Sequence, residues 1–93
     1  MLTLTQTWEL HLEGCQSLKD KRAILQSLKA ELRRKLNVAV AEVAHQDLWQ
    51  RAGIACATVA SDRRVAEETL RTADELVERA DGVRIIETVV TVA

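Results

Sequence analysis

The sequence of 93 residues contains no proline, tyrosine or phenylalanine, and it has only three glycines, two cysteines and two tryptophans. Without tyrosine and phenylalanine it lacks the aromatic platform on which RNA-recognition motifs stack bases. Two cysteines are too few for the disulfide framework of a small secreted domain. We see no secretory signal in the first residues and no apolar run near the ~20 residues that cross a bilayer. We therefore expect a cytoplasmic protein without a membrane segment.

The charge balance and the composition narrow the class further. A net charge of −1 and a pI near 6.1 exclude a generally basic nucleic-acid-binding protein, so such a role would need a local patch. Hydrophobic residues make up 47% and charged residues 29%, a composition typical of a folded chain rather than a disordered one. At this length the chain supports a single domain, which we place at residues 1–93.

Hydrophobic periodicity predicts a strand and then a long helix in the first part of the chain. Apolar and polar residues alternate over residues 2–12, as in a half-buried strand. Ser17 and Asp20 then form a capping-box pattern. The helix is predicted over residues 18–36, where leucines recur at three- and four-residue spacing and form one apolar stripe.

The rest of the chain predicts two strands, a second helix and a last strand. Residues 38–44 and 51–60 are short and β-branched or alanine-rich, as in two strands joined by a turn. A cap at Ser61 or Asp62 predicts a second helix, and residues 83–92 predict a strand. The order β-α-β-β-α-β predicts an α+β fold. It is a ferredoxin-like sandwich, in which a four-stranded antiparallel sheet carries two helices on one face.

That arrangement leaves one face of the sheet without a helix. Simple alternation places Ile85 and Val89 on one face of the last strand, and Ile86 and Val90 on the other, so both faces carry apolar side chains. A second copy of the chain would bury such a surface. We therefore expect a two-fold symmetric homodimer with Ile86 and Val90 in its interface. The alternative is that they are scattered surface aliphatics, as on most proteins.

The two predicted helices carry opposite charge. Residues 17–36 hold seven lysines and arginines against two carboxylates, a net of +5, whereas residues 62–81 hold four against seven, a net of −3. On the first helix, cations and one glutamine follow one another at three- and four-residue spacing within an arc of about 80°. These residues are Lys19, Arg22, Gln26, Lys29 and Arg33.

A basic stripe about 20 Å long matches several successive phosphates of an RNA backbone. The sequence therefore predicts RNA contacts at Lys19, Lys21, Arg22, Lys29 and Arg33. In the alternative interpretation the stripe is a solvated helix face, or it meets the acidic second helix or the acidic surface of a partner. The stems of the cations would then cover apolar surface.

Patterns for catalysis and metal binding are weak. His11 and Cys15 lie near the end of the first strand, where a base and a nucleophile are conceivable, but nothing in the sequence indicates their geometry. His45 and Asp47 flank a turn without a third ligand at metal spacing. Cys56, in an alanine-rich strand, is typical of a small buried hydrophobe. We expect no enzymatic activity, no metal and no small-molecule cofactor.

Three short segments together resemble the YlxP-like family, small bacterial domains of unknown function. They are SLKDKR at residues 17–22, QDLWQR at 46–51 and SDRR at 61–64, the last followed by AEE at 66–68, and residues 40–43 add to the pattern. The resemblance covers nearly the whole chain and implies a ferredoxin-like fold with no established activity. Genes of this family often lie among those for translation initiation and ribosome maturation, including ribosome-binding factor A. The resemblance therefore implies, by gene neighbourhood alone, a link to the ribosome.

The resemblance also marks two sets of residues. They are the signature cations Lys19, Lys21 and Arg22 and the signature turn Asp47, Trp49 and Arg51. In a structural interpretation, Asp47 caps a helical turn and Trp49 fills the sheet edge. If Trp49 is exposed instead, the turn is a candidate partner interface, because tryptophan and arginine are frequent anchors there.

Two functional hypotheses follow from these patterns. The first is a non-catalytic accessory protein that associates with rRNA or a ribosomal particle through its first helix. The alternative is a homodimeric protein-interaction module with no nucleic-acid partner.

Overall fold

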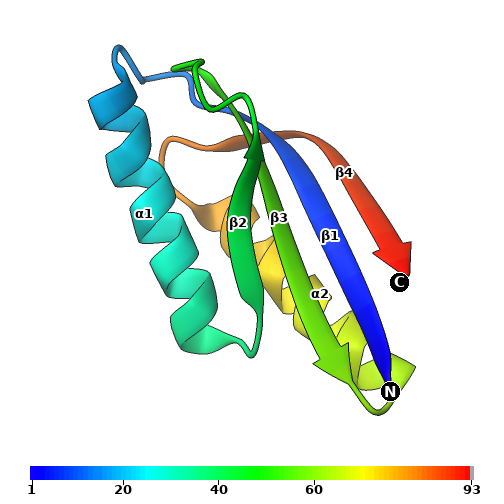
Figure 1. Ribbon diagram of the computed structural model, residues 1–93. Coiled ribbons are helices and arrows are strands. Elements are labelled where there is room, and N and C mark those ends of the chain that lie inside the picture. The colour runs from blue at the N-terminus through cyan, green and yellow to red at the C-terminus, as the bar shows by residue number, and fades with distance from the viewer. Residues whose placement is uncertain (93) are drawn as a thin grey trace.

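The computed structural model describes residues 1–92 and contains six regular elements. In chain order they are β1 (Leu2–His11), α1 (Leu18–Lys35), β2 (Ala39–Ala44), β3 (Arg51–Ala60), α2 (Arg63–Arg79) and β4 (Arg84–Val92). The strands pair antiparallel in the order β2-β3-β1-β4, and both helices lie on one face of the sheet (Figure 1). The predicted ferredoxin-like sandwich is confirmed. No helix within residues 1–92 is long and apolar enough to span a membrane.

Both helices begin at capping side chains. Ser17 Oγ accepts a hydrogen bond from the Asp20 N–H at 3.1 Å, and the Asp20 carboxylate accepts one from the Gln16 N–H at 3.1 Å. Of the two candidate caps for α2, the one used is Asp62, whose carboxylate accepts from the Arg64 N–H at 2.7 Å. These contacts satisfy N–H groups that every helix leaves free at its start. The start of α1 is thereby fixed, and with it the direction in which each of its charged side chains points.

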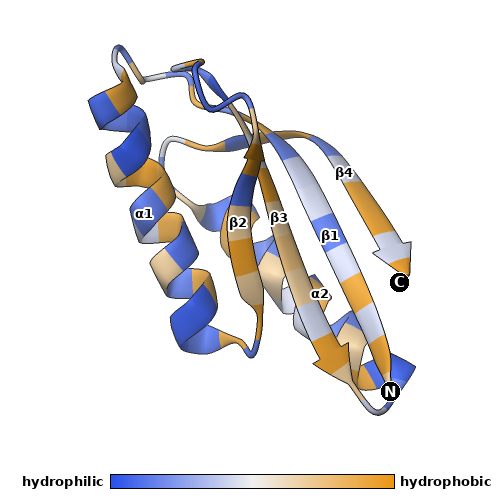
Figure 2. Cartoon of the chain, in the orientation of Figure 1, coloured by the Kyte–Doolittle hydropathy of each residue, from blue (hydrophilic) through white to orange (hydrophobic). Residues whose placement is uncertain are grey.

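The core lies between the sheet and the helices. Every second residue of β1 faces the helices, and Leu4, Trp8 and Leu10 are fully buried there. Figure 2 shows the matching alternation of apolar and polar residues along β1. The helices contribute Leu25, Leu28 and Leu32 from α1, and Ala66, Leu70, Ala73, Leu76 and Val77 from α2. Burial of these side chains is the dominant favourable contribution to folding.

One carboxylate anchors α2 to the sheet. Asp74 Oδ1 accepts hydrogen bonds from Trp8 Nε1 at 2.8 Å and from Gln6 Nε2 at 3.2 Å. Both donors belong to buried residues of β1. A buried donor left without a partner costs about 1–3 kcal/mol, so this contact fixes the position of α2 over β1.

The face of the sheet without helices carries small side chains at its centre. Thr5 and Thr7 of β1 lie directly opposite Ala57 and Ala55 of β3. Paired residues of adjacent antiparallel strands point to the same side of the sheet. The open face is therefore shallow and built from threonine and alanine, without large aliphatic side chains in its middle.

A β-bulge at Ile86 changes which residues of β4 share a face. The register between β1 and β4 shifts there by one residue. Ile85, opposite Leu10, faces the helices, whereas Val89, opposite Thr7, faces the open side. The expectation that Ile85 and Val89 lie on one face is therefore wrong, because simple alternation does not continue through a bulge.

Val90 lies on the helix-bearing side of the sheet. It pairs with Gln6, whose side chain contacts Asp74 of α2. Val90 is nevertheless 56% exposed, and it lines a hollow together with Leu70 and Arg71 of α2. Any partner that covers Val90 would therefore approach from the edge of the sheet and not from its open face.

Candidate nucleic-acid interface

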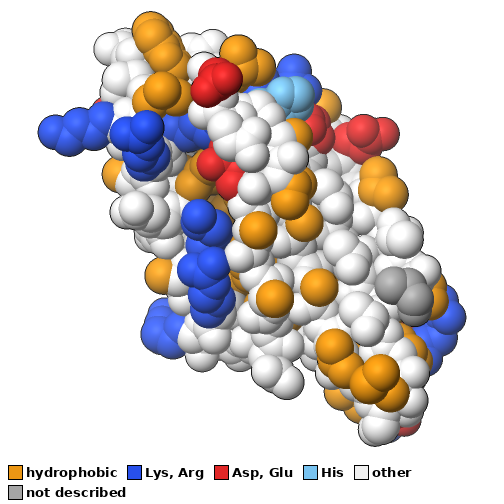
Figure 3. All heavy atoms as spheres, in the orientation of Figure 1, with side chains coloured by type: hydrophobic (Ala, Val, Ile, Leu, Met, Phe, Trp, Pro, Cys, Tyr) orange, Lys and Arg blue, Asp and Glu red, His pale blue; other side chains and the backbone are white. Residues whose placement is uncertain are grey.

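Four cations lie along the side of α1 that borders β2. They are Lys19, Arg22, Lys29 and Arg33, called the basic row below. Figure 3 shows lysine and arginine side chains in a line over this helix. Within residues 1–92, no carboxylate lies within 4.0 Å of any member of the row. The row therefore presents positive charge that its own chain leaves uncompensated.

Lys21 does not belong to this surface. Its side chain is only 3% exposed, and Nζ lies 2.9 Å from Glu42 Oε2 on β2. The ammonium also donates to the carbonyl oxygens of His45 at 2.6 Å and of Leu48 at 2.8 Å. The prediction that Lys21 contacts RNA is corrected: its buried ammonium donates to two carbonyls and is paired with Glu42 inside the protein.

The buried Lys21 connects α1 to β2 and to the loop between β2 and β3. Helix geometry explains its position, because at about 100° per residue Lys21 points the same way as the buried Leu25, Leu28 and Leu32. An ammonium in such a place is stable only when it is paired and hydrogen-bonded. Glu42 and two backbone carbonyls meet that need and fix the loop against the start of α1.

Arg33 protects the edge of the sheet as well as extending the basic row. One NH2 group donates to the carbonyl of Val40 on β2 at 2.8 Å. β2 is an edge strand, and this contact occupies a backbone acceptor on the sheet. A guanidinium has five N–H donors, so Arg33 retains others for an anion.

The loop between β2 and β3 is held by several backbone contacts. His45 has a left-handed φ of 62°, and its carbonyl accepts from the Leu48 N–H at 3.0 Å. The Gln50 carbonyl accepts from the Leu12 N–H at 2.9 Å, and Gln50 Nε2 donates to the Cys15 carbonyl at 3.3 Å. Together with Lys21, these contacts give the loop a defined shape.

Trp49 projects from this ordered loop. It is 50% exposed, and its neighbours Asp47 and Leu48 are exposed as well. The structural interpretation, in which Trp49 fills the sheet edge, does not hold. Residues 47–51, of which Trp49 is the middle one, line a hollow of about 470 Å³. The sequence motif gave the residues of this turn but not their exposure, which depends on the contacts of Lys21 and Gln50.

Arg51 takes part in a charged cluster on the open side of the sheet. Glu9 Oε1 lies 2.5 Å from an Arg51 NH2 group and 2.6 Å from His45 Nε2. Periodicity alone could not pair Glu9 with these residues, because the contact needs the register of β1 against β3. Arg51 is therefore partly compensated, unlike the cations of the basic row.

The five residues predicted as a partner interface do not form one surface. Asp47, Trp49 and Arg51 lie at the loop end of β3, whereas Ile86 and Val90 lie on β4, beyond β1. Val90 pairs with Gln6 of β1, and Gln6 pairs with Cys56 of β3. Cys56 lies five residues along β3 from Arg51, so Val90 is displaced from the loop end by about 17 Å along the strands. Val90 is therefore distant from the loop residues, whereas Ile86, in the bulge opposite Glu9 and Leu10, is level with the loop end of β3 but two strands away from it.

The nucleophilic side chains are buried. Burial raises the pKa of the Cys15 thiol, the nearby Asp20 carboxylate raises it further, and Lys21 opposes them in part. Burial raises the pKa of Cys56 to about 11. A thiol is nucleophilic only as thiolate, so neither cysteine is activated. Within residues 1–92, no group of three or more histidine, cysteine, aspartate or glutamate side chains is placed to hold a metal ion.

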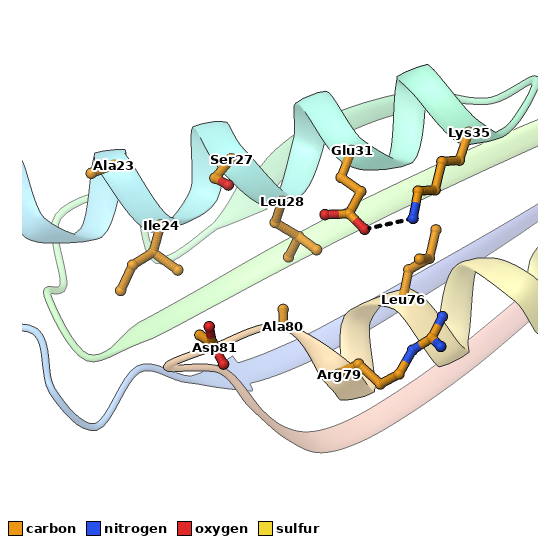
Figure 4. A pocket seen from close by; sticks show the side chains of 10 residues that line it. All are labelled: Ala23, Ile24, Ser27, Leu28, Glu31, Lys35, Leu76, Arg79, Ala80 and Asp81. Carbon is orange, nitrogen blue, oxygen red and sulfur yellow. Dashed lines mark ion pairs between the residues drawn. The ribbon is translucent and has the colours of Figure 1, made fainter.

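A groove between the two helices escaped the sequence analysis. It has a volume of about 500 Å³, and Figure 4 shows Ile24 and Leu28 of α1 pointing across it toward Ala80 and Asp81, at the end of α2. The Glu31–Lys35 ion pair, at 3.2 Å, borders it. Periodicity identifies an apolar stripe on each helix, but it does not give the distance between two helices.

The fold and the basic row define the class: a small α+β protein of ferredoxin-like architecture with a cationic helix at one edge. The chain belongs to the DUF503 family, described as a protein of unknown function, whose model matches residues 3–90. The resemblance to the YlxP-like family is thereby confirmed. The chain is 40% identical over 55 residues to the uncharacterized protein YlxP of Bacillus subtilis (strain 168). That match spans 59% of this chain and only 60% of the relative.

Solved structures of other proteins share the fold at low sequence identity. SnoaB, a cofactor-independent oxygenase from Streptomyces nogalater, has a TM-score of 0.63 at 9% identity, covering 100% of this chain and 94% of that one. The de novo designed protein Foldit4 has a TM-score of 0.59 at 11% identity, covering 98% and 97%. A designed protein with ferredoxin fold has a TM-score of 0.57 at 14% identity, covering 100% and 84%. At these identities the likeness concerns the fold alone.

Proposed function

We propose that this protein is a non-catalytic accessory protein that binds the phosphate backbone of folded RNA, such as rRNA in a ribosomal particle, through the basic row. The observation that carries the proposal is the row itself: four cations on one side of α1, with no carboxylate within 4.0 Å in residues 1–92. The ribosomal setting is suggested by the family resemblance. The role is a cytoplasmic one.

The dimensions of the row suit a nucleic-acid backbone. From Lys19 to Arg33 it extends about 21 Å, at ~1.5 Å per residue. Phosphates along one strand are a few ångströms apart, so four cations reach several of them. The acidic α2, with a net of −3 over residues 62–81, lies on the other side of the helical layer. This charge asymmetry orients the protein so that α1 approaches the anion.

Charge reversal in the row tests the proposal. Arg22→Glu with Lys29→Glu should weaken binding to an rRNA fragment at least tenfold, measured by fluorescence anisotropy. The matched control is Arg71→Glu with Arg79→Glu, which makes the same charge change on α2 and should leave the affinity within about twofold of the unaltered protein. Arg22, Arg71 and Arg79 are exposed and Lys29 is half-buried, so circular dichroism must show that the fold of both variants is unchanged.

Salt dependence provides the second arm of this test. With four phosphate contacts, affinity should fall roughly 100-fold between about 50 and about 200 mM salt. Co-sedimentation with ribosomal particles should weaken in parallel. The proposal fails if the Arg22→Glu, Lys29→Glu variant binds RNA like the unaltered protein, or if no RNA is bound at low salt.

The edge strand β4 supports a second candidate, a homodimeric protein-interaction module. Val89, Val90 and Val92 are each about half exposed, and β4 has no strand on its outer side within residues 1–92. Long apolar edges of this kind pair readily with another strand. Light scattering during size exclusion, over micromolar concentrations, would show a mass near twice 10.4 kDa if two copies pair. A single mass near 10.4 kDa throughout would remove this candidate.

A further inference from the structure

The loop between β2 and β3 lies directly beside the basic row. Gln46 of the loop and the row members Arg22 and Lys29 line one depression of about 100 Å³. Lys21, the residue before Arg22, donates to two carbonyls of the same loop. A ligand that lies along the row therefore reaches the loop without any rearrangement of the protein.

Trp49 is the exposed aromatic side chain of the loop. The chain has two tryptophans and no tyrosine or phenylalanine, and Trp8 is fully buried. Trp49 is half exposed on a loop whose backbone is fixed on both sides, by Lys21 at Leu48 and by Leu12 at Gln50. An indole held in this way offers a flat face to a ligand at little entropic cost.

The chemistry around Trp49 favours a base over a phosphate. Asp47 contributes a carboxylate to the hollow around the indole, and that charge repels phosphate while it accepts hydrogen bonds from the amino and imino groups of a base. Arg51 borders the same hollow, but its guanidinium is paired with Glu9. The basic row has positive charge and no aromatic side chain. The loop has an aromatic side chain, and its arginine is already paired with a carboxylate.

From this juxtaposition we infer that the ligand is RNA at a junction of duplex and single strand: the duplex backbone lies along the basic row and one unpaired base stacks on Trp49. The inference rests on the proposed function and names its substrate class. A single exposed aromatic stacks one base, so an extended single strand, which needs several such platforms, does not fit this surface. A blunt duplex uses the row alone.

The test compares two RNA ligands: a blunt hairpin and the same hairpin with a three-nucleotide 3′ or 5′ single-stranded extension. The unaltered protein should bind one of the extended hairpins about 5- to 100-fold more tightly than the blunt one, the range that stacking of one base gives. Trp49→Ala should abolish this preference and leave the affinity for the blunt hairpin unchanged. Val59→Ala, at a similarly exposed position of β3 outside this hollow, is the matched control and should keep the preference.

Fluorescence gives an independent readout on the same complexes. Acrylamide should quench Trp49 in the free protein, and the extended hairpin should quench its emission directly and protect it from acrylamide, while the blunt hairpin should do neither. Trp8, which is fully buried, reports on folding in the Trp49→Ala variant.

Three results overturn the inference, and they are distinguishable. If the unaltered protein and the Trp49→Ala variant both bind blunt and extended hairpins with equal affinity, base stacking on Trp49 is refuted, while binding through the basic row stands. If Trp49→Ala leaves RNA binding unaltered but abolishes capture of a protein partner at high salt, the loop is a protein-docking site. If no hairpin binds at low salt, the proposed function fails and the inference fails with it.

Discussion

The two edges of the sheet are built differently. β2, with six residues, shifts register between Glu42 and Ala44, and α1 runs beside it. Its backbone is contacted by Arg33, and its Glu42 is paired with the buried Lys21. β4, with nine residues, carries half-exposed valines and has no neighbour on its outer side within residues 1–92. One edge is protected by charged side chains of a helix and the other is bare.

The comparison shows that one helix, α1, can both protect an edge of the sheet and present positive charge to a ligand. Cations that α1 brings to β2 occupy backbone and carboxylate groups on the inner side, through Lys21 and Arg33. The other members of the basic row, Lys19, Arg22 and Lys29, make no ion pair within residues 1–92. The β4 edge has no such side chains, so its surface suits strand pairing rather than an anion.

The largest expected effect concerns the buried ammonium at the β2 edge. Lys21→Met should lower the free energy of unfolding by about 3 kcal/mol, because Glu42 would lose its partner and two loop carbonyls would lose their donor. Urea denaturation followed by circular dichroism measures this change. Lys19→Met, at an exposed position on the same helix, should cost less than about 0.5 kcal/mol. Equal midpoints for the two variants would show that the contacts of Lys21 do not secure this edge.

A smaller loss is expected on the other side of the sheet, where Asp74 holds α2. Asp74→Ala should cost about 1–3 kcal/mol, because the Trp8 and Gln6 donors would lose their acceptor. Asp74→Asn keeps an oxygen acceptor and should cost less. Thermal unfolding of the three proteins checks this order. If the alanine and asparagine variants melt together, the hydrogen bonds of Asp74 contribute nothing and only its packing matters.

Exposed positions on the two edges should differ in self-association and hardly in stability. Val90→Lys on β4 should change the free energy of unfolding by no more than about 0.5 kcal/mol. It should also abolish any concentration-dependent increase in mass. Ala41→Lys on β2, also exposed, should leave self-association unchanged. Light scattering measures the mass of both variants. If Ala41→Lys abolished self-association, the contact between copies would lie at the β2 edge, and the prediction would be wrong.

A pH dependence reports on β3, the strand between β1 and β2. The pKa of Cys56, in β3, is raised to about 11 from 9.0. Above pH 9 the unfolded thiol ionises while the native thiol stays protonated, so stability should fall as pH rises from about 9 to 11. The stability difference between the unaltered protein and Cys56→Ala should therefore shrink or change sign across this window. A difference independent of pH would mean that β3 is open to water.

The fold was predictable because its signals are local. The alternation in β1, the caps at Ser17 and Asp62 and the stripes of the two helices each agree with one arrangement of elements. The burial of Lys21 also had a signal, since its helical angle matches that of the leucines, but the sequence motif had grouped it with the exposed cations. Helix phase is the better guide when a charged residue falls on an apolar face.

The remaining features depend on contacts between distant segments. The bulge at Ile86 cannot be seen in the residue pattern of β4. It places Val89 on the open face of the sheet and Val90 on the face that carries the helices. The exposure of Trp49 depends on the Lys21 contacts to the loop, 24 and 27 residues along the chain. Pairings of this kind arise only once the whole sheet is assembled.

The contacts of Lys21 also have a thermodynamic consequence for any ligand of this surface. Because the helix and the loop are already joined, no segment has to fold when a ligand arrives. Complex formation should therefore lack the large negative heat-capacity change of coupled folding and binding. Calorimetric titrations at several temperatures should give enthalpies that change little with temperature, and association should proceed in one kinetic phase.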